Sequence, residues 1–246
     1  MANWNEPRND TGLGVSSGLG RQGGVATTVD AGLRRHMLSI YNYMTSGVLL
    51  SGIVALLTWT SGFAVVIFSG PLRWLVALAP LAIVFAMSFG QARFSTGTLR
   101  AMFWAFAVLM GLSLSSIFAI YSGPSIAATF FATAGAFAGL SLFGYTTKKD
   151  LSAFGTFLIM GVFGLIIAMI ANMFIHSQGL AMAIPFLGVL IFAGLTAFDT
   201  QKLKTQYYTI PREYAGKAVV LGALNLYLDF INMFLFLLRF MGSSRN

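Results

Sequence analysis

One apolar run near the carboxyl end carries a single acidic residue, Ala218-Val-Val-Leu-Gly-Ala-Leu-Asn-Leu-Tyr-Leu-Asp229-Phe-Ile-Asn-Met-Phe-Leu-Phe-Leu-Leu-Arg-Phe240. Its length is close to the ~20 residues that a helix needs to cross a bilayer. Asp229 stands near the middle of the run, where a lone carboxylate is costly unless it faces other helices, a partner or water. The run therefore predicts a transmembrane helix whose carboxyl group points into a bundle.

The composition of the whole chain agrees with a membrane location. The 246 residues are 57% hydrophobic and only 9% charged, whereas soluble domains carry about 25% charged residues. The mean hydropathy is +0.79. The chain has no cysteine, which excludes a disulfide framework and a thiolate metal site. We therefore predict an integral membrane protein and exclude most soluble classes.

Apolar stretches of similar length recur along the chain and predict seven crossings. They lie at about 38–60, 72–92, 101–121, 125–145, 153–175, 179–199 and 218–240. They lack the alternation of a barrel strand, so they are expected to be helices. Pro80 and Pro185 fall inside two of them and should bend each helix. The fold class is thus an all-α integral membrane protein, a seven-transmembrane-helix bundle.

Two details of this bundle remain open in the sequence. The segment 61–70 is apolar enough either to extend the first helix or to form an interfacial loop. In the fourth span, 132–139 carries small residues at four-residue spacing, which lets helix backbones approach closely. We expect this face to pack inside the bundle, with a homodimer contact as the alternative.

The basic residues predict the topology. We expect residues 1–33, which are polar and glycine-rich, to form a disordered cytoplasmic tail ahead of a transmembrane domain over 34–246. With the amino terminus inside, twelve basic residues fall in inside segments: Arg8, Arg21, Arg34, Arg35, Arg93, Arg100, Lys148, Lys149, Lys202, Lys204, Arg212 and Lys217. Three fall outside: Arg73, Arg239 and Arg245. This asymmetry follows the positive-inside rule and places the carboxyl terminus outside.

Two acidic residues stand apart from the other five, which lie in the tail or in loops. Asp229 shares one helix face with Asn225 and Asn232, at i−4 and i+3. Asp199 closes the sixth span, and polar and basic residues follow it, so the helix can continue and keep Asp199 inside the bundle. Consecutive spans are antiparallel neighbours, and we expect the two carboxyl groups to converge. Either they form a hydrogen-bonding node that locks the bundle, or they form an ionisable site.

Two close carboxyl groups in a medium of low dielectric constant cannot both ionise cheaply. A proton or a cation relieves their repulsion, and hard oxygen ligands favour Ca²⁺ or Mg²⁺. The sequence therefore predicts a pH-sensitive cation site at Asp199 and Asp229. Arg93 ends the second span on the same side as Asp199, where it is either a latch for that aspartate or an ordinary membrane anchor.

Several segments resemble the transmembrane Bax-inhibitor-motif family in its bacterial branch. The resemblance covers about residues 34–242, and its most specific part is the run 226–240 around Asp229. The supporting segments are Gly111-Leu-Ser-Leu-Ser-Ser-Ile117, Tyr145-Thr-Thr-Lys-Lys-Asp150-Leu-Ser152 and Phe198-Asp199-Thr-Gln201. The resemblance implies a bundle with the last helix at its centre, in the inner membrane of a bacterium.

The resemblance also implies a function. Members of the family are described as pH-sensitive calcium leak channels without a tightly bound cofactor, and their paired aspartates correspond to Asp199 and Asp229. Arg93 matches the basic residue that latches the first of these aspartates. Some members carry a further acid on the second helix, but the segment 81–86 has none here. Bacterial relatives are also linked to control of a membrane-bound protease, so a regulator without transport activity is the alternative.

Enzymatic and nucleic-acid functions are disfavoured. An intramembrane aspartyl protease needs Gly-x-Gly-Asp at its second acid, but Leu226-Tyr-Leu precedes Asp229. Gly111-Leu-Ser113 imitates the motif of a membrane serine protease, but no span holds a histidine as base. The two histidines lie at opposite membrane faces, which disfavours zinc, and no basic patch with interleaved aromatics suggests nucleic acid. The predicted partners are lipid, calcium ions and, for the alternative, a membrane protease.

Overall fold

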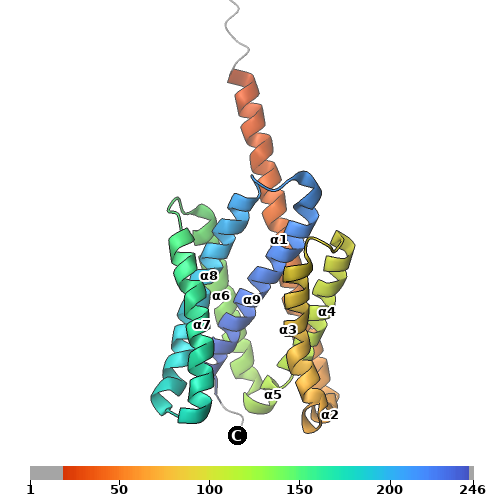
Figure 1. Ribbon diagram of the computed structural model, residues 1–246, viewed down its shortest axis with the longest axis vertical. Helices are drawn as coiled ribbons and strands as arrows, with labels where there is room; N and C mark the ends of the chain where they lie inside the picture. The colour runs from red at the N-terminus through yellow and green to blue at the C-terminus, as the bar shows by residue number, and fades with distance from the viewer. Residues whose placement is uncertain (1–18, 244–246) are drawn as a thin grey trace, which may run out of the picture. The chain divides into compact units, whose positions relative to one another are not determined.

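The computed structural model describes residues 19–243, and helices dominate this part of the chain (Figure 1). The elements are α1 (Leu19–Thr60), α2 (Phe63–Ser69), α3 (Leu72–Gly90), α4 (Thr96–Leu114), α5 (Ile117–Ile120), α6 (Gly123–Thr146), α7 (Ser152–Ile175), α8 (Gln178–Gln206), a 3₁₀ turn η1 (Arg212–Tyr214) and α9 (Ala215–Met241). Within residues 19–243, seven helical segments are long and apolar enough to cross a membrane. The predicted all-α fold with seven spans is therefore confirmed.

The segment 61–70 does not extend the first helix. Gly62 adopts a left-handed conformation with φ 76°, which glycine reaches without the steric penalty that a Cβ would bring. The chain reverses there and forms the short helix α2 before Pro71 leads into α3. The sequence left open a longer first helix or an interfacial loop. The structure has a connecting segment, as in the second possibility, but this segment folds into a separate short helix.

The structure departs from the prediction for the amino-terminal segment. Residues 1–18 of the predicted disordered tail lie outside the described residues, but α1 begins at Leu19 and is helical over 19–33. Once a helix has formed, each added residue gains one hydrogen bond, and 19–33 contains no proline to interrupt it. The chain divides into two compact units after Arg35, and the helix bundle belongs to the unit that begins at His36.

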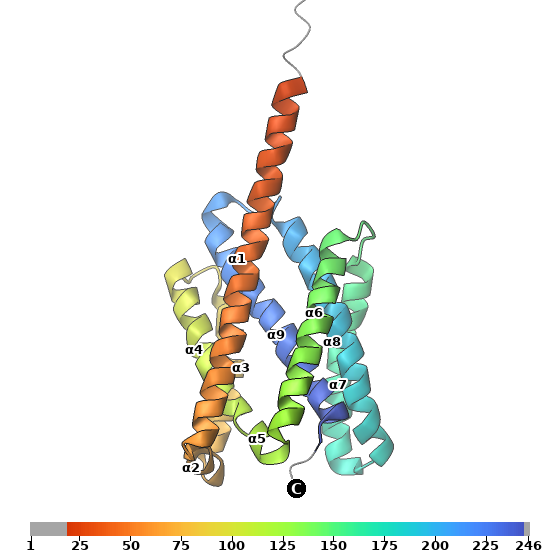
Figure 2. The same ribbon diagram turned by 180° about the vertical axis from the view of Figure 1, so that it is seen from behind.

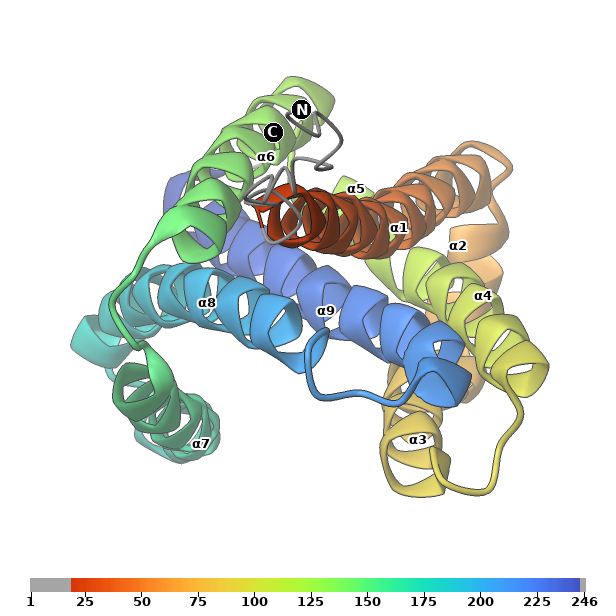
Figure 3. The same ribbon diagram turned by 90° about the horizontal axis from the view of Figure 1, so that it is seen from above.

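The last helix lies at the centre of the bundle, as the family resemblance implies. In the most apolar stretch of α9, 67% of the residues are buried, against 11% in the corresponding stretch of α7. α9 packs against α8 and α6 on one side and against α4 on the other, and Figure 3 shows it between these helices. An acidic residue in the middle of α9 is therefore surrounded by other helices and not by lipid.

The small-residue face of α6 differs from the expectation. Ala132, Gly135 and Gly139 are exposed, and a Cβ at either glycine would meet open space. The intramolecular contact lies one turn later, where Gly144 touches the backbone of Ala197 in α8. Figure 2 shows α6 and α8 side by side. Thr129, Thr133, Phe137, Ser141 and Gly144 form the buried face of α6, so the small residues Ala132, Gly135 and Gly139 do not face the bundle.

One end of the bundle carries most of the positive charge. The connections α3–α4, α6–α7 and α8–α9 lie at this end (Figure 1). We call it the basic end and define it by Arg93, Arg100, Lys148, Lys149, Lys202, Lys204, Arg212 and Lys217. Among the described residues from His36 on, the basic residues at the opposite end are only Arg73 and Arg239. The basic residues that the predicted spans assign to one membrane face thus lie at one end of the bundle.

Candidate functional site

The structure places Asp229 in the interior of the bundle and leaves Asp199 half-buried on α8. α8 continues to Gln206, seven residues beyond Asp199, which places Asp199 about 10 Å from the helix end. Asp229 lies in the middle of α9 and is only 4% exposed. The expectation that the sixth helix would run past Asp199 is confirmed, because the polar residues after it belong to the same helix.

The carboxyl groups of Asp199 and Asp229 are within hydrogen-bonding reach of each other. Asp229 Oδ2 is buried and has no hydrogen-bond partner among the described residues. A carboxylate only accepts hydrogen bonds, so two carboxyl groups can bond to each other only when one of them holds a proton. Without that proton, two negative charges would meet in a site of low dielectric constant. Either a proton or a cation would relieve the repulsion between two such charges.

The end of α8 that carries Asp199 is held by contacts with α6 and the α6–α7 connection. The hydroxyl groups of Thr200 and Ser141 lie 3.2 Å apart. The Gln201 side chain accepts from the Leu151 backbone at 2.8 Å and donates to the Lys149 carbonyl at 2.7 Å. Lys204 Nζ donates to the Tyr145 carbonyl at 2.7 Å. These bonds fix the register of α8 and hence the position of Asp199 opposite α9.

The two asparagines of the predicted polar stripe have different surroundings. Asn232 donates to the Leu228 carbonyl at 2.8 Å, within its own helix. Asn225 lines a cavity of about 520 Å³ at the basic end, between the end of α3, the end of α8 and the start of α9. Asn225 is one turn from Asp229. The cavity therefore leads from the basic end to within one helical turn of the carboxyl pair.

The residues that line this cavity are polar toward the basic end. They include Ser88, Gln91, Gln206, Lys202 and Lys217. Lys217 Nζ donates to the Gln91 carbonyl at 3.1 Å and so joins the start of α9 to the end of α3. A polar cavity of this size can hold water, and water supplies the hydration that a small ion needs beside a buried site. We call it the inner cavity.

Arg93 is not brought to the carboxyl pair. It is exposed in the turn that follows α3, and within residues 31–243 it makes no ion pair with Asp199. The basic residue that stands beside Asp199 on the same helix is Lys202, whose side chain is exposed. Lys202 was not connected with the carboxyl pair in the sequence analysis. Its position three residues after Asp199 on one helix could have indicated that the two side chains are neighbours. In this structure Arg93 therefore makes no contact with Asp199 that would support the predicted role as a latch.

A calcium ion would have to complete its coordination from several sources. The pair offers at most four carboxylate oxygens, while Ca²⁺ takes 6–8 oxygen ligands. No third acidic residue or histidine joins the pair within the described residues. The Asn225 amide precedes Asp229 by one turn on α9 and lines the inner cavity, which is polar enough to hold water.

A second polar cluster, which the sequence did not predict, lies on the other side of α9. Ser51 Oγ lies 2.6 Å from the Tyr227 hydroxyl, and it is 2.7 Å from the Ala107 carbonyl and 2.9 Å from the Gly47 carbonyl. Ser51 and Tyr227 are fully buried. Phe106 packs edge-on against the Tyr227 ring with centroids 4.9 Å apart. This hydroxyl cluster joins α1, α4 and α9.

These features define a class of protein: a multi-pass α-helical membrane protein with an acidic pair beside its central helix. The family model described as inhibitor of apoptosis-promoting Bax1 matches residues 33–246. The match covers most of the chain, so this protein belongs to the Bax inhibitor family.

Bacterial relatives match almost along their whole length. A protein of Caulobacter vibrioides is 47% identical over 230 residues, covering 89% of this chain and 92% of the relative. Inner membrane protein YbhL of Escherichia coli K12 is 43% identical over 220 residues, covering 87% and 94%. A membrane protein of Streptococcus pyogenes is 32% identical over 224 residues, covering 89% and 97%. Two of the three are thus named as membrane proteins.

Proposed function

We propose that this protein is a pH-sensitive cation leak of the inner membrane, with calcium as its main ion, and that the Asp199–Asp229 pair controls it. The observation that carries the proposal is the pair itself, in which Asp229 is buried and its Oδ2 lacks a hydrogen-bond partner among the described residues. A group that only locked helices would have its lone pairs occupied, because an unsatisfied buried polar atom costs ~1–3 kcal/mol. A carboxyl pair that exchanges a proton for a cation has a use for the free oxygen.

The inner cavity supports a path to this pair. It opens at the basic end and reaches Asn225, one turn from Asp229. By the positive-inside rule we propose that the basic end faces the cytoplasm and that the carboxyl terminus lies outside. An ion would then move between the cytoplasm and the pair through hydrated space. Its route beyond the pair, along α9 between apolar side chains, requires the helices to move.

The alternative function is regulation of a membrane protease without transport. A regulator of that kind needs a docking surface and does not need a buried carboxyl pair. The two functions are separated by measuring calcium entry into liposomes that contain the purified protein. We expect calcium entry with the wild-type protein and about tenfold less with Asp229→Asn, which corresponds to ~1.4 kcal/mol of lost ion stabilisation.

A matched control is Asp150→Asn. Asp150 is a fully exposed acid at the basic end, so this variant removes the same charge outside the bundle and should leave calcium entry unchanged. Absence of calcium entry with folded wild-type protein at every pH would reject the leak and favour the regulator. Equal loss of entry in Asp150→Asn and Asp229→Asn would reject the role of the pair.

A further inference from the structure

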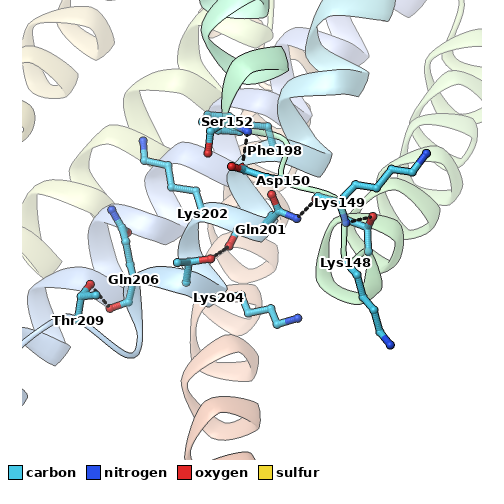
Figure 4. A pocket seen from close by; sticks show the side chains of 12 residues that line it. Lys148, Lys149, Asp150, Ser152, Phe198, Gln201, Lys202, Lys204, Gln206 and Thr209 are labelled. Atoms are coloured by element: carbon cyan, nitrogen blue, oxygen red, sulfur yellow. Dashed lines mark hydrogen bonds between the residues drawn. The ribbon is translucent and has the colours of Figure 1, made fainter.

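A second cavity lies at the basic end; it shares Lys202 and Gln206 with the inner cavity but does not reach Asn225. It has a volume of about 630 Å³ and lies between the α6–α7 connection and the last turns of α8. Four lysines line it, Lys148 and Lys149 on one side and Lys202 and Lys204 on the other, together with one acid, Asp150. Figure 4 shows the two lysine pairs coming from these two segments, with Gln201 between them. We call it the lysine cavity.

The charges of the lysine cavity are only partly used within the protein. Lys204 Nζ is held by the Tyr145 carbonyl, and Lys202 lies over the Phe198 ring. The exposed ammonium groups of Lys148 and Lys149 make no hydrogen bond or ion pair within residues 31–243. The carboxylate of Asp150 is engaged: hydrogen bonding to the Ser152 side chain and to its backbone lowers the pKa of Asp150, and the backbone bond is 2.9 Å long. The cavity therefore has an excess of positive charge, which favours the binding of an anion.

The surroundings of the cavity indicate the chemistry of that anion. Ser152 lines the cavity and is the first residue of α7, the span with the smallest buried share among the described residues. Phe154 and Phe157 follow within two turns and are 49% and 69% exposed. An anionic head in the cavity could thus continue into apolar chains along α7. Basic pockets at the cytoplasmic ends of transmembrane helices suit phosphate groups of anionic lipids.

We infer that the lysine cavity binds a phosphate group, supplied by an anionic phospholipid or by a soluble phosphate ester. The inference stands on the cavity, its lysines and the adjoining apolar face of α7, and does not depend on the proposed cation leak. Lys148 and Lys149 would turn toward the bound phosphate, because their side chains are flexible and their ammonium groups have no partner within residues 31–243. Gln201 would keep the two sides of the cavity together through its bonds to the α6–α7 connection.

The test uses the full-length protein in a zwitterionic detergent. Short-chain phosphatidylglycerol and glycerol phosphate are titrated separately by calorimetry into wild type, a Lys148→Gln/Lys149→Gln variant and an Arg100→Gln/Arg212→Gln variant. The last variant removes the same charge from exposed residues of the basic end that do not line the cavity. We expect binding to weaken about 30-fold in the lysine variant, from ~1 kcal/mol for each lysine, and less than about twofold in the arginine variant.

The two titrants distinguish the sources of phosphate. Binding of phosphatidylglycerol alone assigns the cavity to a lipid headgroup, and equal binding of glycerol phosphate assigns it to a soluble ester. Equal weakening in both double variants would overturn the inference, because it would show attraction to the basic end as a whole. Absence of binding of either titrant to the wild-type protein would overturn it as well. A photoreactive phosphatidylglycerol should label peptides from 147–152 or 201–209, and labelling confined to other segments would contradict the assignment.

Discussion

The central helix carries two buried polar sites that are only two residues apart but face opposite sides. Tyr227 belongs to the hydroxyl cluster with Ser51, in which Ser51 Oγ has three partners within 2.9 Å. Asp229 belongs to the carboxyl pair, and one of its oxygens has no hydrogen-bond partner among the described residues. Residues two apart on a helix differ by about 200° in direction, so each site faces a different set of helices.

The two sites differ in how completely their polar atoms are hydrogen-bonded, and this difference suggests a structural role for one site and a functional role for the other. A buried hydroxyl group with all its bonds made rigidifies the contact between helices and has little capacity left for a ligand. A buried carboxyl group with an unused oxygen is costly to keep, unless a proton or an ion uses it. We therefore assign the hydroxyl cluster to the packing of α1, α4 and α9, and the carboxyl pair to the proposed activity.

The largest expected effect comes from disturbing the setting of the carboxyl pair. A side chain at Gly144 would collide with the Ala197 backbone, two residues before Asp199. We expect Gly144→Val to destabilise the protein by ~3 kcal/mol, because a backbone atom cannot move aside as a side chain can. Gly139→Val is the control, since a Cβ there meets open space. Thermal unfolding in detergent measures both, and equal midpoints for the two variants would argue against the close α6–α8 contact.

A smaller effect is expected at the hydroxyl cluster. Tyr227→Phe removes one hydroxyl group from a buried network while the ring keeps its packing against Phe106. We expect a loss of ~1 kcal/mol in stability, the usual net contribution of one hydrogen bond, and an unchanged pH dependence of calcium entry. Unfolding and liposome measurements on the same preparation check both parts. A change in the pH dependence as large as that of Asp229→Asn would erase the distinction between the two sites.

The smallest effect is expected at an acid outside the bundle. At the start of α7, hydrogen bonding to the Ser152 side chain and then to the Ser152 backbone lowers the pKa of Asp150. The stabilisation is therefore present above the pKa of the unfolded chain, about 3.9, and is lost as the pH falls through the lower value of the folded protein. Asp150→Ala should reduce the unfolding midpoint slightly at neutral pH and not at about pH 2. A difference that grows toward low pH would contradict this sign.

The sequence was sufficient to predict the helices and the convergence of the two aspartates. Apolar length determines a span, and a mid-span carboxyl group must face inward, so the amino-acid order alone places Asp229 inside the bundle. The hydroxyl cluster could not be found in this way. Serine and tyrosine are common in apolar spans, and the contact of Ser51 with Tyr227 joins residues that are far apart in the chain.

At two other segments the structure lacks the contact that one of the two open interpretations required. The small residues of 132–139 suggested an internal contact, but they are exposed, because the spacing of small residues does not show which face of a helix meets a neighbour. Arg93 was placed near Asp199 because both lie toward the same membrane face, but a shared depth does not determine the distance within the membrane plane. Lys202, three residues after Asp199 on α8, is the basic residue beside that aspartate along the helix.

The central claim is that the carboxyl pair makes ion passage depend on pH. The direct measurement is the initial rate of calcium entry into liposomes from about pH 5 to about pH 8, for wild type, Asp229→Asn and Tyr227→Phe. An asparagine has no titrating proton, so we predict that the rate varies with pH in wild type and Tyr227→Phe but stays flat and low in Asp229→Asn. A rate in Asp229→Asn that follows the wild-type pH profile would contradict the account.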